Sequence, residues 1–248
     1  MIEIRSIRYN YPDGTPALKG IDLDIPHGEF LIVCGPNGSG KTTLIRMMKG
    51  LIRPLSGSIR IDGRDIFRDG SEVLRRVGIV FQDADAQIVG ETVGEDVAFG
   101  PENLGLCEEE VRERVSSALL ATGLDHLAEK PCHRLSGGEK RRVAIAGTLA
   151  MASDILIFDE PFANLDYAGV RQVLAQIAVL HEAGHTIVLT THDIEKAAAH
   201  ADRVAVLFEG ELKAQGSLES ILPDLPLYGI RPPCDCALGK KAAQWPAG

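Results

Sequence analysis

The sequence predicts an α/β fold with a mixed or largely parallel sheet, an N-terminal antiparallel β part and a helical subdomain over about residues 83–150. Short apolar runs alternate with helical stretches through the second half of the chain, which is typical of a parallel sheet. The first third has the pattern of strands and turns, and the region between the two is mostly helical. At 248 residues the chain is long enough for one substantial core, so we expect a single domain with a smaller insert.

The N-terminal third carries the predicted antiparallel strands. Residues 2–9 have strand character, and Ile21, Leu23 and Ile25 alternate with aspartates, as in a half-buried strand. Phe30–Cys34 is apolar throughout and therefore predicts a fully buried strand. Two further short strands are predicted at residues 59–61, before a turn at Asp62 and Gly63, and at residues 77–81.

The remaining elements follow from the period of the apolar residues. Residues 108–120 predict an amphipathic helix, and Ser136 is a suitable N-cap for a second helix. Buried strands are predicted at residues 155–158, 186–190 and 204–208, separated by helices at residues 170–182 and 194–201. Residues 223–248 lack periodicity and are rich in Pro, Gly, Cys and Lys, so we expect a domain over residues 1–222 and a loosely ordered tail.

The composition excludes several classes of protein. Acidic residues outnumber basic residues by 35 to 26, and the resulting charge of -9 disfavours broad binding to nucleic acid or to an anionic membrane surface. The sequence has no apolar run of about 18 residues and does not begin with a secretory pattern. We therefore expect a cytosolic protein that binds no nucleic acid and reaches any membrane through a protein partner.

The five cysteines are too few and too scattered for a disulfide scaffold. Cys34 ends an apolar strand, where a small buried hydrophobic residue is needed, and this favours packing over reactivity. Cys234 and Cys236 have no second pair nearby, so they complete no tetrahedral metal site. A reducing compartment is the simplest interpretation.

A glycine-rich loop carries the first chemistry. Residues 35–42 fit the pattern G-x-x-x-x-G-K-[ST] and lie between a buried strand and an expected helix at residues 43–48, which is the context that confirms this motif. Glycines let the backbone close around phosphate oxygens, Lys41 adds positive charge, and Thr42 offers its hydroxyl to Mg²⁺. The predicted ATP-binding residues are Gly35, Pro36, Asn37, Gly38, Ser39, Gly40, Lys41, Thr42 and Thr43.

Two acidic residues complete the expected phosphate site. Asp159 and Glu160 end the strand predicted at residues 155–158. Asp159 is suited to hold magnesium through water, and Glu160 is placed to polarise the water that attacks the γ-phosphate. The chain is therefore predicted to be a phosphate-loop NTPase that uses ATP and Mg²⁺.

A third motif points to a family. Ser136, Gly137, Gly138 and Glu139 resemble the signature that separates ABC ATPases from other phosphate-loop enzymes, although many relatives have glutamine in place of Glu139. A serine cap and two glycines expose a helix N-terminus that suits an anion. The resemblance, which covers residues 1–222, implies the ABC ATPase fold and a head-to-tail dimer in which the signature reaches the ATP of the opposite subunit.

The resemblance assigns further residues by their order along the chain. Gln82 resembles the glutamine that contacts magnesium and the attacking water, and His192 resembles the histidine that contacts the γ-phosphate. Residues 163–166 resemble the loop that communicates between the two sites. Tyr11 resembles the aromatic residue that stacks on adenine, with Tyr9 as the nearby alternative.

The branch of the family is indicated by residues 82–106, 144–151 and 161–166, which resemble the ATPases of energy-coupling-factor importers of vitamins or of cobalt and nickel. This resemblance implies a transmembrane coupling protein that docks near residues 82–89, a separate solute-binding membrane subunit, and a position at the cytoplasmic face of the membrane. The alternatives are the ATPase of another ABC transporter and a non-transport ABC ATPase. The sequence leaves open the solute and whether the chain pairs with itself or with a paralogue.

Overall fold

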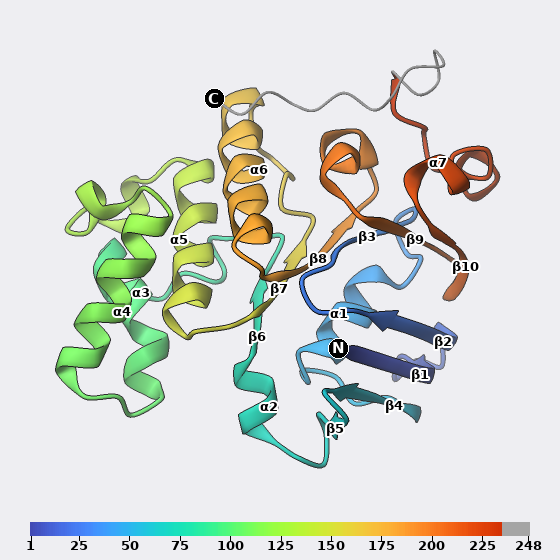
Figure 1. Cartoon of the computed structure of the whole chain (residues 1–248), viewed down its shortest axis with the longest axis horizontal. Coiled ribbons are helices and arrows are strands. Elements are labelled where there is room, and N and C mark those ends of the chain that lie inside the picture. Colours follow the sequence, from blue (N-terminus) through green and yellow to red (C-terminus); the bar gives the residue numbers. More distant parts are fainter. Residues whose placement is uncertain (235–248) are drawn as a thin grey trace.

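The computed structural model describes residues 1–234 and consists of two β-sheets, a helix between them and a separate group of helices (Figure 1). A six-stranded sheet crosses the middle of the molecule in the order β10-β9-β3-β8-β7-β6. All of its neighbouring strands are parallel except β10, which pairs antiparallel with β9. Its strands are β3 (Phe30–Cys34), β6 (Val77–Val80), β7 (Ile155–Asp159), β8 (Thr186–Thr191), β9 (Arg203–Phe208) and β10 (Glu211–Gly216).

The second sheet has four strands in the order β2-β1-β4-β5, and all of their pairs are antiparallel. This confirms the predicted N-terminal antiparallel part. The sequence did not reveal the short edge strand β5 of this sheet or the helix that follows it. The bounds are β1 (Ile2–Asn10), β2 (Pro16–Ile25), β4 (Ser56–Ile61), β5 (Arg64–Asp65) and α2 (Ser71–Arg75).

The two faces of the six-stranded sheet belong to two different cores. In β3, Leu31 and Val33 pack with helix α1 (Lys41–Met48) and the four-stranded sheet, whereas Phe30, Ile32 and Cys34 pack on the side of helix α6 (Tyr167–Glu182). Every residue of β3 is buried. A strand that is covered on both faces has no polar positions, which explains the uniformly apolar run in the sequence.

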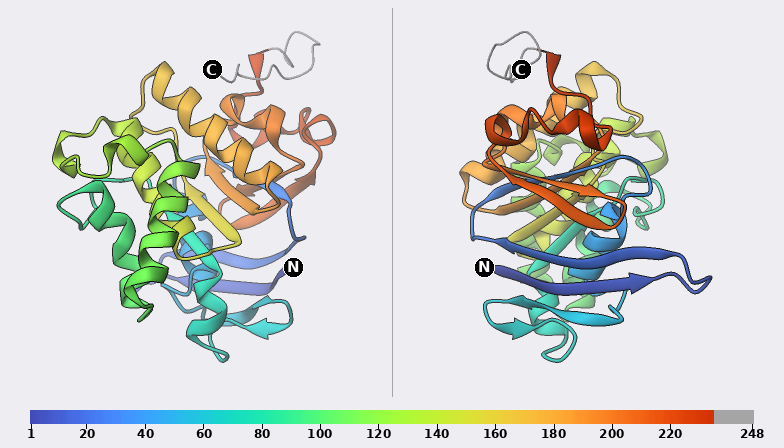
Figure 2. Two further views of the ribbon diagram at one scale, coloured as in Figure 1. Left: turned by 60° about the vertical axis from the view of Figure 1, so that its left-hand side comes forward. Right: turned by 90° about the vertical axis from the view of Figure 1, so that its right-hand side faces the viewer.

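A third core belongs to the helical region. It is formed mainly by three helices, and Figure 2 shows these standing beside the two sheets, next to edge strand β6. The helices are α3 (Val93–Asn103), α4 (Glu108–Ala121) and α5 (Gly137–Ala150), with 3-10 turns at Asp125–Leu127 and Cys132–Arg134. Within residues 1–234, no helix combines the length and the apolar character needed to cross a membrane.

Two expectations are corrected at the C-terminal side. Residues 194–201 form two 3-10 turns, Ile194–Lys196 and Ala198–His200, and not one helix. The side chain of Asp193 accepts a hydrogen bond from the N–H of Glu195 and so starts a tight turn at once.

Residues 223–234 are not loosely ordered as expected. After the short helix α7 (Leu218–Ile221), a 3-10 turn at Leu225–Tyr228 brings Leu225 and Ile230 into the core beside α6, where they are 0% and 2% exposed. Residues 235–248, including Cys236, lie outside the described residues.

Candidate functional site

The phosphate loop joins the end of β3 to the start of α1. Gly40, the residue before the helix, has φ 104°, and a Cβ there would lie 2.7 Å from the carbonyl oxygen of Ala17, so only glycine fits. Helix α1 has no side-chain cap and no acidic residue in its first turn. The hydroxyl of Ser39 is buried without a hydrogen-bond partner among the described residues. Free N–H groups and an unpaired hydroxyl favour the binding of an anion here.

Lys41 is folded back onto this loop. Its Nζ donates hydrogen bonds to the carbonyl oxygens of Gly35 at 2.8 Å and Pro36 at 3.1 Å, and it lies 3.9 Å from Oε1 of Glu160. Burial lowers the pKa of the Lys41 ammonium, and the nearby carboxylates of Glu160 and Asp159 oppose this shift. Lys41 therefore places a positive charge directly over the loop.

The carboxylate of Asp159 stands at the end of β7, opposite the loop. Its Oδ1 accepts hydrogen bonds from Oγ1 of Thr42 at 3.2 Å and from Oγ1 of Thr190 at 2.7 Å. Asp159 is 3% exposed. A hydroxyl and a carboxylate, with the amide of Gln82 lining the same cavity, form a set of oxygen donors that suits Mg²⁺.

Glu160 and His192 follow the ends of neighbouring strands. Glu160 has φ 46°, and its N–H donates to the backbone oxygen of Thr190 at 3.1 Å. Its carboxylate lies 3.0 Å from Nδ1 of His192. A non-glycine residue at positive φ is strained, and such strain is concentrated at functional sites. The bend turns the carboxylate of Glu160 toward Lys41 and the phosphate loop.

Tyr11 lines a cavity of about 370 Å³ with the phosphate loop, Gln82 and Glu160. Its hydroxyl hydrogen-bonds to Oγ1 of Thr43 at 2.7 Å, and the residue is 43% exposed. Tyr9 stands edge-on to Tyr11 at 5.6 Å and packs against the core. Of the two tyrosines, Tyr11 has the ring that is available to a ligand.

The signature residues begin α5. Ser136 accepts a hydrogen bond from the N–H of Glu139 at 3.3 Å, and its own N–H donates to Oε2 of Glu139 at 2.7 Å, so the predicted cap is a capping box. Gly137 lines a second cavity of about 770 Å³ with Thr42, Gln82 and Asp159. Ser136, Gly138 and Glu139 line neither this cavity nor the one at Tyr11. The chain thus does not bring its own Ser136 to its phosphate loop.

Sequence reasoning missed two residues of this site. Thr190 holds both Asp159 and the backbone of Glu160, and Arg141 holds the backbone before and at Gln82. Thr190 pairs with Asp159 in the register of β7 and β8, so a polar residue at the end of a buried strand was the available signal. Arg141 gave no such sequence signal, because it lies in a helical stretch among other basic residues and nothing in the pattern distinguishes it from them.

Known proteins resemble this chain over most of its length. The ABC transporter family model matches residues 18–163. The cobalt import ATP-binding protein CbiO of Rhodobacter capsulatus is 46% identical over 97% of this chain and 89% of its own length. The energy-coupling factor transporter ATP-binding protein EcfA of Methanocaldococcus jannaschii is 43% identical over 91% of this chain and 82% of its own length.

Two solved structures have the same fold. CbiO1 of Clostridium perfringens, described as part of the ABC transporter complex CbiONQ, superposes with a TM-score of 0.80 at 40% identity, over 92% of this chain and 96% of its own. The ATP-binding cassette MJ0796, a dimer in a post-hydrolysis state with ADP and phosphate, gives 0.76 at 30% identity over 88% and 99%. With its phosphate loop, its Asp159–Glu160 pair and its capped signature helix, the chain belongs to the ABC transporter family as an ATP-hydrolysing, ATP-binding subunit of the energy-coupling-factor type.

Proposed function

We propose that this chain hydrolyses ATP to power an energy-coupling-factor importer of a small solute, either a transition-metal ion such as cobalt or nickel or a vitamin. The observation that carries this proposal is the approach of Gln82, Asp159 and Glu160 to the phosphate loop, with His192 in contact with Glu160. These residues end or follow the neighbouring parallel strands β6, β7 and β8. The crevice at the carboxyl ends of parallel strands is where ligands bind in open α/β sheets.

The proposed roles follow from the contacts. The N–H groups of the phosphate loop and the ammonium of Lys41 bind the β- and γ-phosphates, and the ring of Tyr11 stacks on adenine. Thr42, Gln82 and Asp159 would hold Mg²⁺, which supplies neutralising charge on the phosphates when bound. Glu160 accepts the proton of the attacking water, and His192 holds that carboxylate in place and faces the γ-phosphate.

The functional unit in this proposal is a dimer. Ser136 caps α5 and lines neither cavity at the phosphate loop of its own chain, and Ser136 and Gly137 are both exposed. The dimeric cassette MJ0796 supports a pair of subunits. In a head-to-tail pair, the signature residues Ser136, Gly137, Gly138 and Glu139 would close over the ATP of a second subunit, either a copy or a paralogue. Each phosphate loop would then be complete only when a partner covers it.

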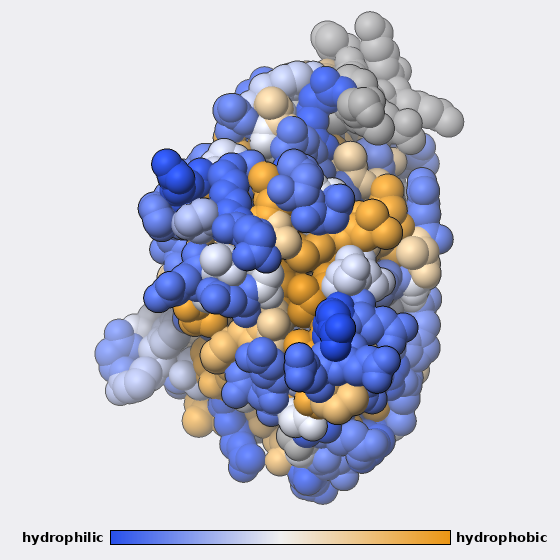
Figure 3. Space-filling view, turned by 90° about the vertical axis from the view of Figure 1, so that its left-hand side faces the viewer, coloured by the Kyte–Doolittle hydropathy of each residue, from blue (hydrophilic) through white to orange (hydrophobic). Residues whose placement is uncertain are grey.

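The membrane partner is inferred from the helical region. Val89 and Phe99 are 61% and 52% exposed, although both are large and apolar. Figure 3 views the molecule from the side of this region and shows a band of hydrophobic residues down the middle of the face, between hydrophilic margins. Apolar patches of this kind mark protein contacts. We place the coupling protein and the solute-binding subunit on this side, with the chain at the cytoplasmic face of the membrane.

Replacement of Glu160 tests the enzymatic half of the proposal. Glu160→Gln should lower kcat of the purified chain by about 10² to 10⁴ while ATP binding is retained, because an amide accepts no proton from water. Exposed Glu109 on α4 offers the matched control, and Glu109→Gln should hydrolyse ATP at the normal rate. Near-normal turnover of Glu160→Gln would remove Glu160 from the role of base.

Membrane association tests the transport half. The chain is expressed with and without candidate membrane subunits of an energy-coupling-factor importer, and membranes are then washed at high salt. We expect the chain in the membrane fraction only when a coupling protein is co-expressed. Recovery with a permease that depends on a substrate-binding protein would contradict the energy-coupling-factor assignment.

A further inference from the structure

Arg141 connects the signature helix to the backbone at Gln82. Its guanidinium extends from α5 and donates hydrogen bonds to two successive carbonyl oxygens, those of Phe81 and Gln82, the latter at 2.7 Å from Nη2. Arg141 is only 3% exposed, and its Nε has no partner among the described residues. A planar guanidinium that donates to two acceptors fixes their relative position more firmly than a single ammonium does.

Gln87 holds the same stretch of backbone from the other side. Its Oε1 accepts a hydrogen bond from the N–H of Phe81 at 2.9 Å, and its Nε2 donates to the carbonyl oxygen of Ile79 at 2.9 Å. Strand β6 is at the edge of the six-stranded sheet, so Gln87 takes the place of a neighbouring strand there. The backbone from Ile79 to Gln82 is thus held by four side-chain hydrogen bonds.

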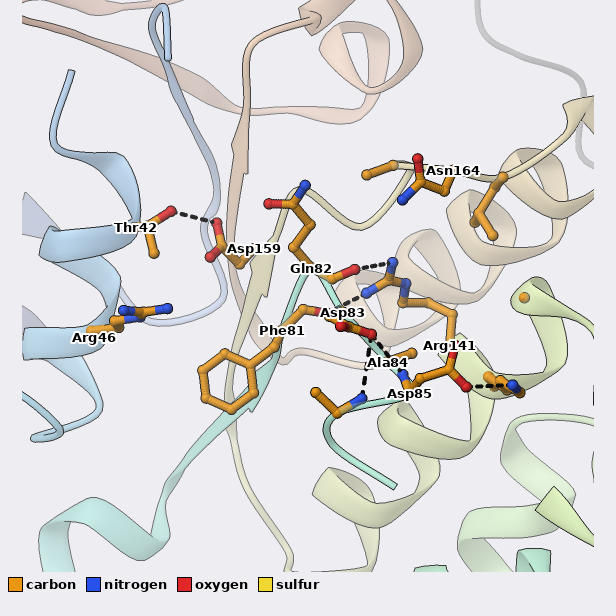
Figure 4. A pocket seen from close by; sticks show the side chains of 15 residues that line it. Thr42, Arg46, Phe81, Gln82, Asp83, Ala84, Asp85, Arg141, Asp159 and Asn164 are labelled. Carbon is orange, nitrogen blue, oxygen red and sulfur yellow. Dashed lines mark hydrogen bonds and ion pairs between the residues drawn. The ribbon is translucent and has the colours of Figure 1, made fainter. Parts of the chain in front are cut away.

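The side chain of Gln82 points away from this clamp. In Figure 4 the guanidinium of Arg141 reaches the carbonyl of Gln82, while the Gln82 amide extends to the opposite side, where Thr42 and Asp159 lie. Gln82 lines both the cavity with Tyr11 and the cavity with Gly137. A shift of its backbone would therefore move the amide relative to Asp159 and Glu160.

We propose that Arg141 and Gln87 are positioning residues that hold Gln82 against the ATP site and tie its position to the signature helix of the same chain. Arg141 lies one turn after Gly137 on α5, and so a movement of this helix is passed to the Gln82 backbone through the guanidinium. Closure of a second subunit over the signature of the first would then fix the position of Gln82 in the first subunit. This inference rests on the proposed function, because it requires Gln82 to act in hydrolysis.

A double-mutant cycle tests the link. The kcat and KM for MgATP are measured for the full chain, with its membrane subunits if turnover requires them, as Gln82→Ala, Arg141→Met and the double variant. We expect each single change to lower kcat by about 10- to 100-fold, because a misplacement of about 1 Å costs about 10²-fold. The double variant should be no slower than the slower single variant, and KM should change little, because the phosphate loop is intact.

Controls separate positioning from general damage. Arg142 is the neighbouring arginine on α5, and its Nη1 donates to the carbonyl oxygen of Thr122 at 3.2 Å, away from Gln82. Any loss caused by Arg142→Met should therefore be the same in the wild-type and Gln82→Ala backgrounds. Arg141→Lys should recover part of the activity lost in Arg141→Met. If Arg141→Met does not fold, Gln87→Met replaces it in the cycle, since Gln87 is only partly buried.

Each outcome is decisive. Equal losses from Arg141→Met in both backgrounds would overturn the inference, because they would indicate a structural role that does not act through Gln82. Unchanged kcat in both Arg141→Met and Gln87→Met would also overturn it. Normal turnover of Gln82→Ala would instead remove Gln82 from the proposed mechanism, and no hydrolysis by the unaltered chain would contradict the proposed function itself.

Discussion

Nδ1 of His192 lies 3.0 Å from both carboxylate oxygens of Glu160, so the two side chains from the ends of β7 and β8 are held together. Lys41 approaches the same carboxylate from the phosphate loop, with Nζ 3.9 Å from Oε1. The Glu160 side chain is 12% exposed, whereas that of His192 is 57% exposed. Glu160 is therefore fixed in position, and His192 is the partner that solvent and ligand can reach.

The first prediction concerns this pair. His192→Ala should lower kcat by about 10² and leave the affinity for ATP within a few-fold, because a misplaced base loses proton-transfer efficiency while the phosphate loop is unaffected. Steady-state ATPase assays and nucleotide titrations measure the two quantities. His126, 67% exposed and remote from the loop, provides the control, and His126→Ala should have normal turnover. Equal kcat for both variants would contradict a role of His192 beside Glu160.

The strands of the larger sheet could be predicted from the sequence, with the exception of β10. β3 is apolar throughout, and β7 and β8 are apolar except for Asp159 and the threonines at 186, 190 and 191, because both faces of these strands are covered. Strand β10 was missed because none of its residues is buried and its sequence mixes charged, polar and small residues. Its only sequence signal was the pair Glu209-Gly210. Both residues have positive φ, and they form the turn after β9.

The fold of the C-terminal segment could not be predicted from the spacing of its apolar residues. Leu225 and Ile230 are buried, whereas Leu227 between them is 72% exposed, so the apolar residues of this stretch do not all face the core. Buried and exposed apolar residues spaced in this way follow neither a helical nor a strand period. Similarly, the candidate site residues follow from motifs, whereas the hydrogen bonds of Thr190 and Arg141 depend on strand register and on the approach of α5 to β6.

The second prediction separates the stacking of the Tyr11 ring on adenine from the hydrogen bond of its hydroxyl to Thr43. Tyr11→Ala should weaken ATP binding by about 10-fold or more, because stacking of a base on an aromatic ring contributes about 1–3 kcal/mol. Tyr11→Phe should bind ATP within about 3-fold of normal, because it loses only the hydrogen bond to Thr43. Fluorescence titration with a nucleotide analogue measures both affinities. Tyr9→Ala should instead lower the free energy of unfolding, and a selective loss of ATP affinity in that variant would reverse the assignment.

The third prediction concerns the thiol of Cys34. Burial raises its pKa to about 12, although the charge of Lys41 opposes the shift. A raised pKa keeps the thiol protonated below that pH, and at pH 8 only about one molecule in 10⁴ carries the thiolate that reacts with alkylating agents. Iodoacetamide should therefore modify exposed Cys107 in the folded protein and spare Cys34, and it should modify both after unfolding in guanidinium. Mass spectrometry of the peptides follows each site, and equal rates in the folded protein would contradict the burial of Cys34.

The last prediction concerns the capping box at the signature helix. The hydrogen bond from the N–H of Ser136 lowers the pKa of Glu139, with a further contribution from Lys130 at 3.1 Å. A carboxyl with a lowered pKa stabilises the fold above its unfolded value of about 4.3, and this stability is lost as pH falls through the folded value.

Glu139→Gln should consequently reduce the free energy of unfolding by about 0.5–1 kcal/mol at pH 7, since the amide still accepts from Ser136 but carries no charge for Lys130 or the helix N-terminus. The difference from wild type should shrink as pH falls below about 4.3. Urea unfolding at pH 7 and pH 3.5 measures it, with exposed Glu113→Gln in the middle of α4 as the control. A loss of stability that is equal at both pH values would show that the charge of Glu139 does not contribute.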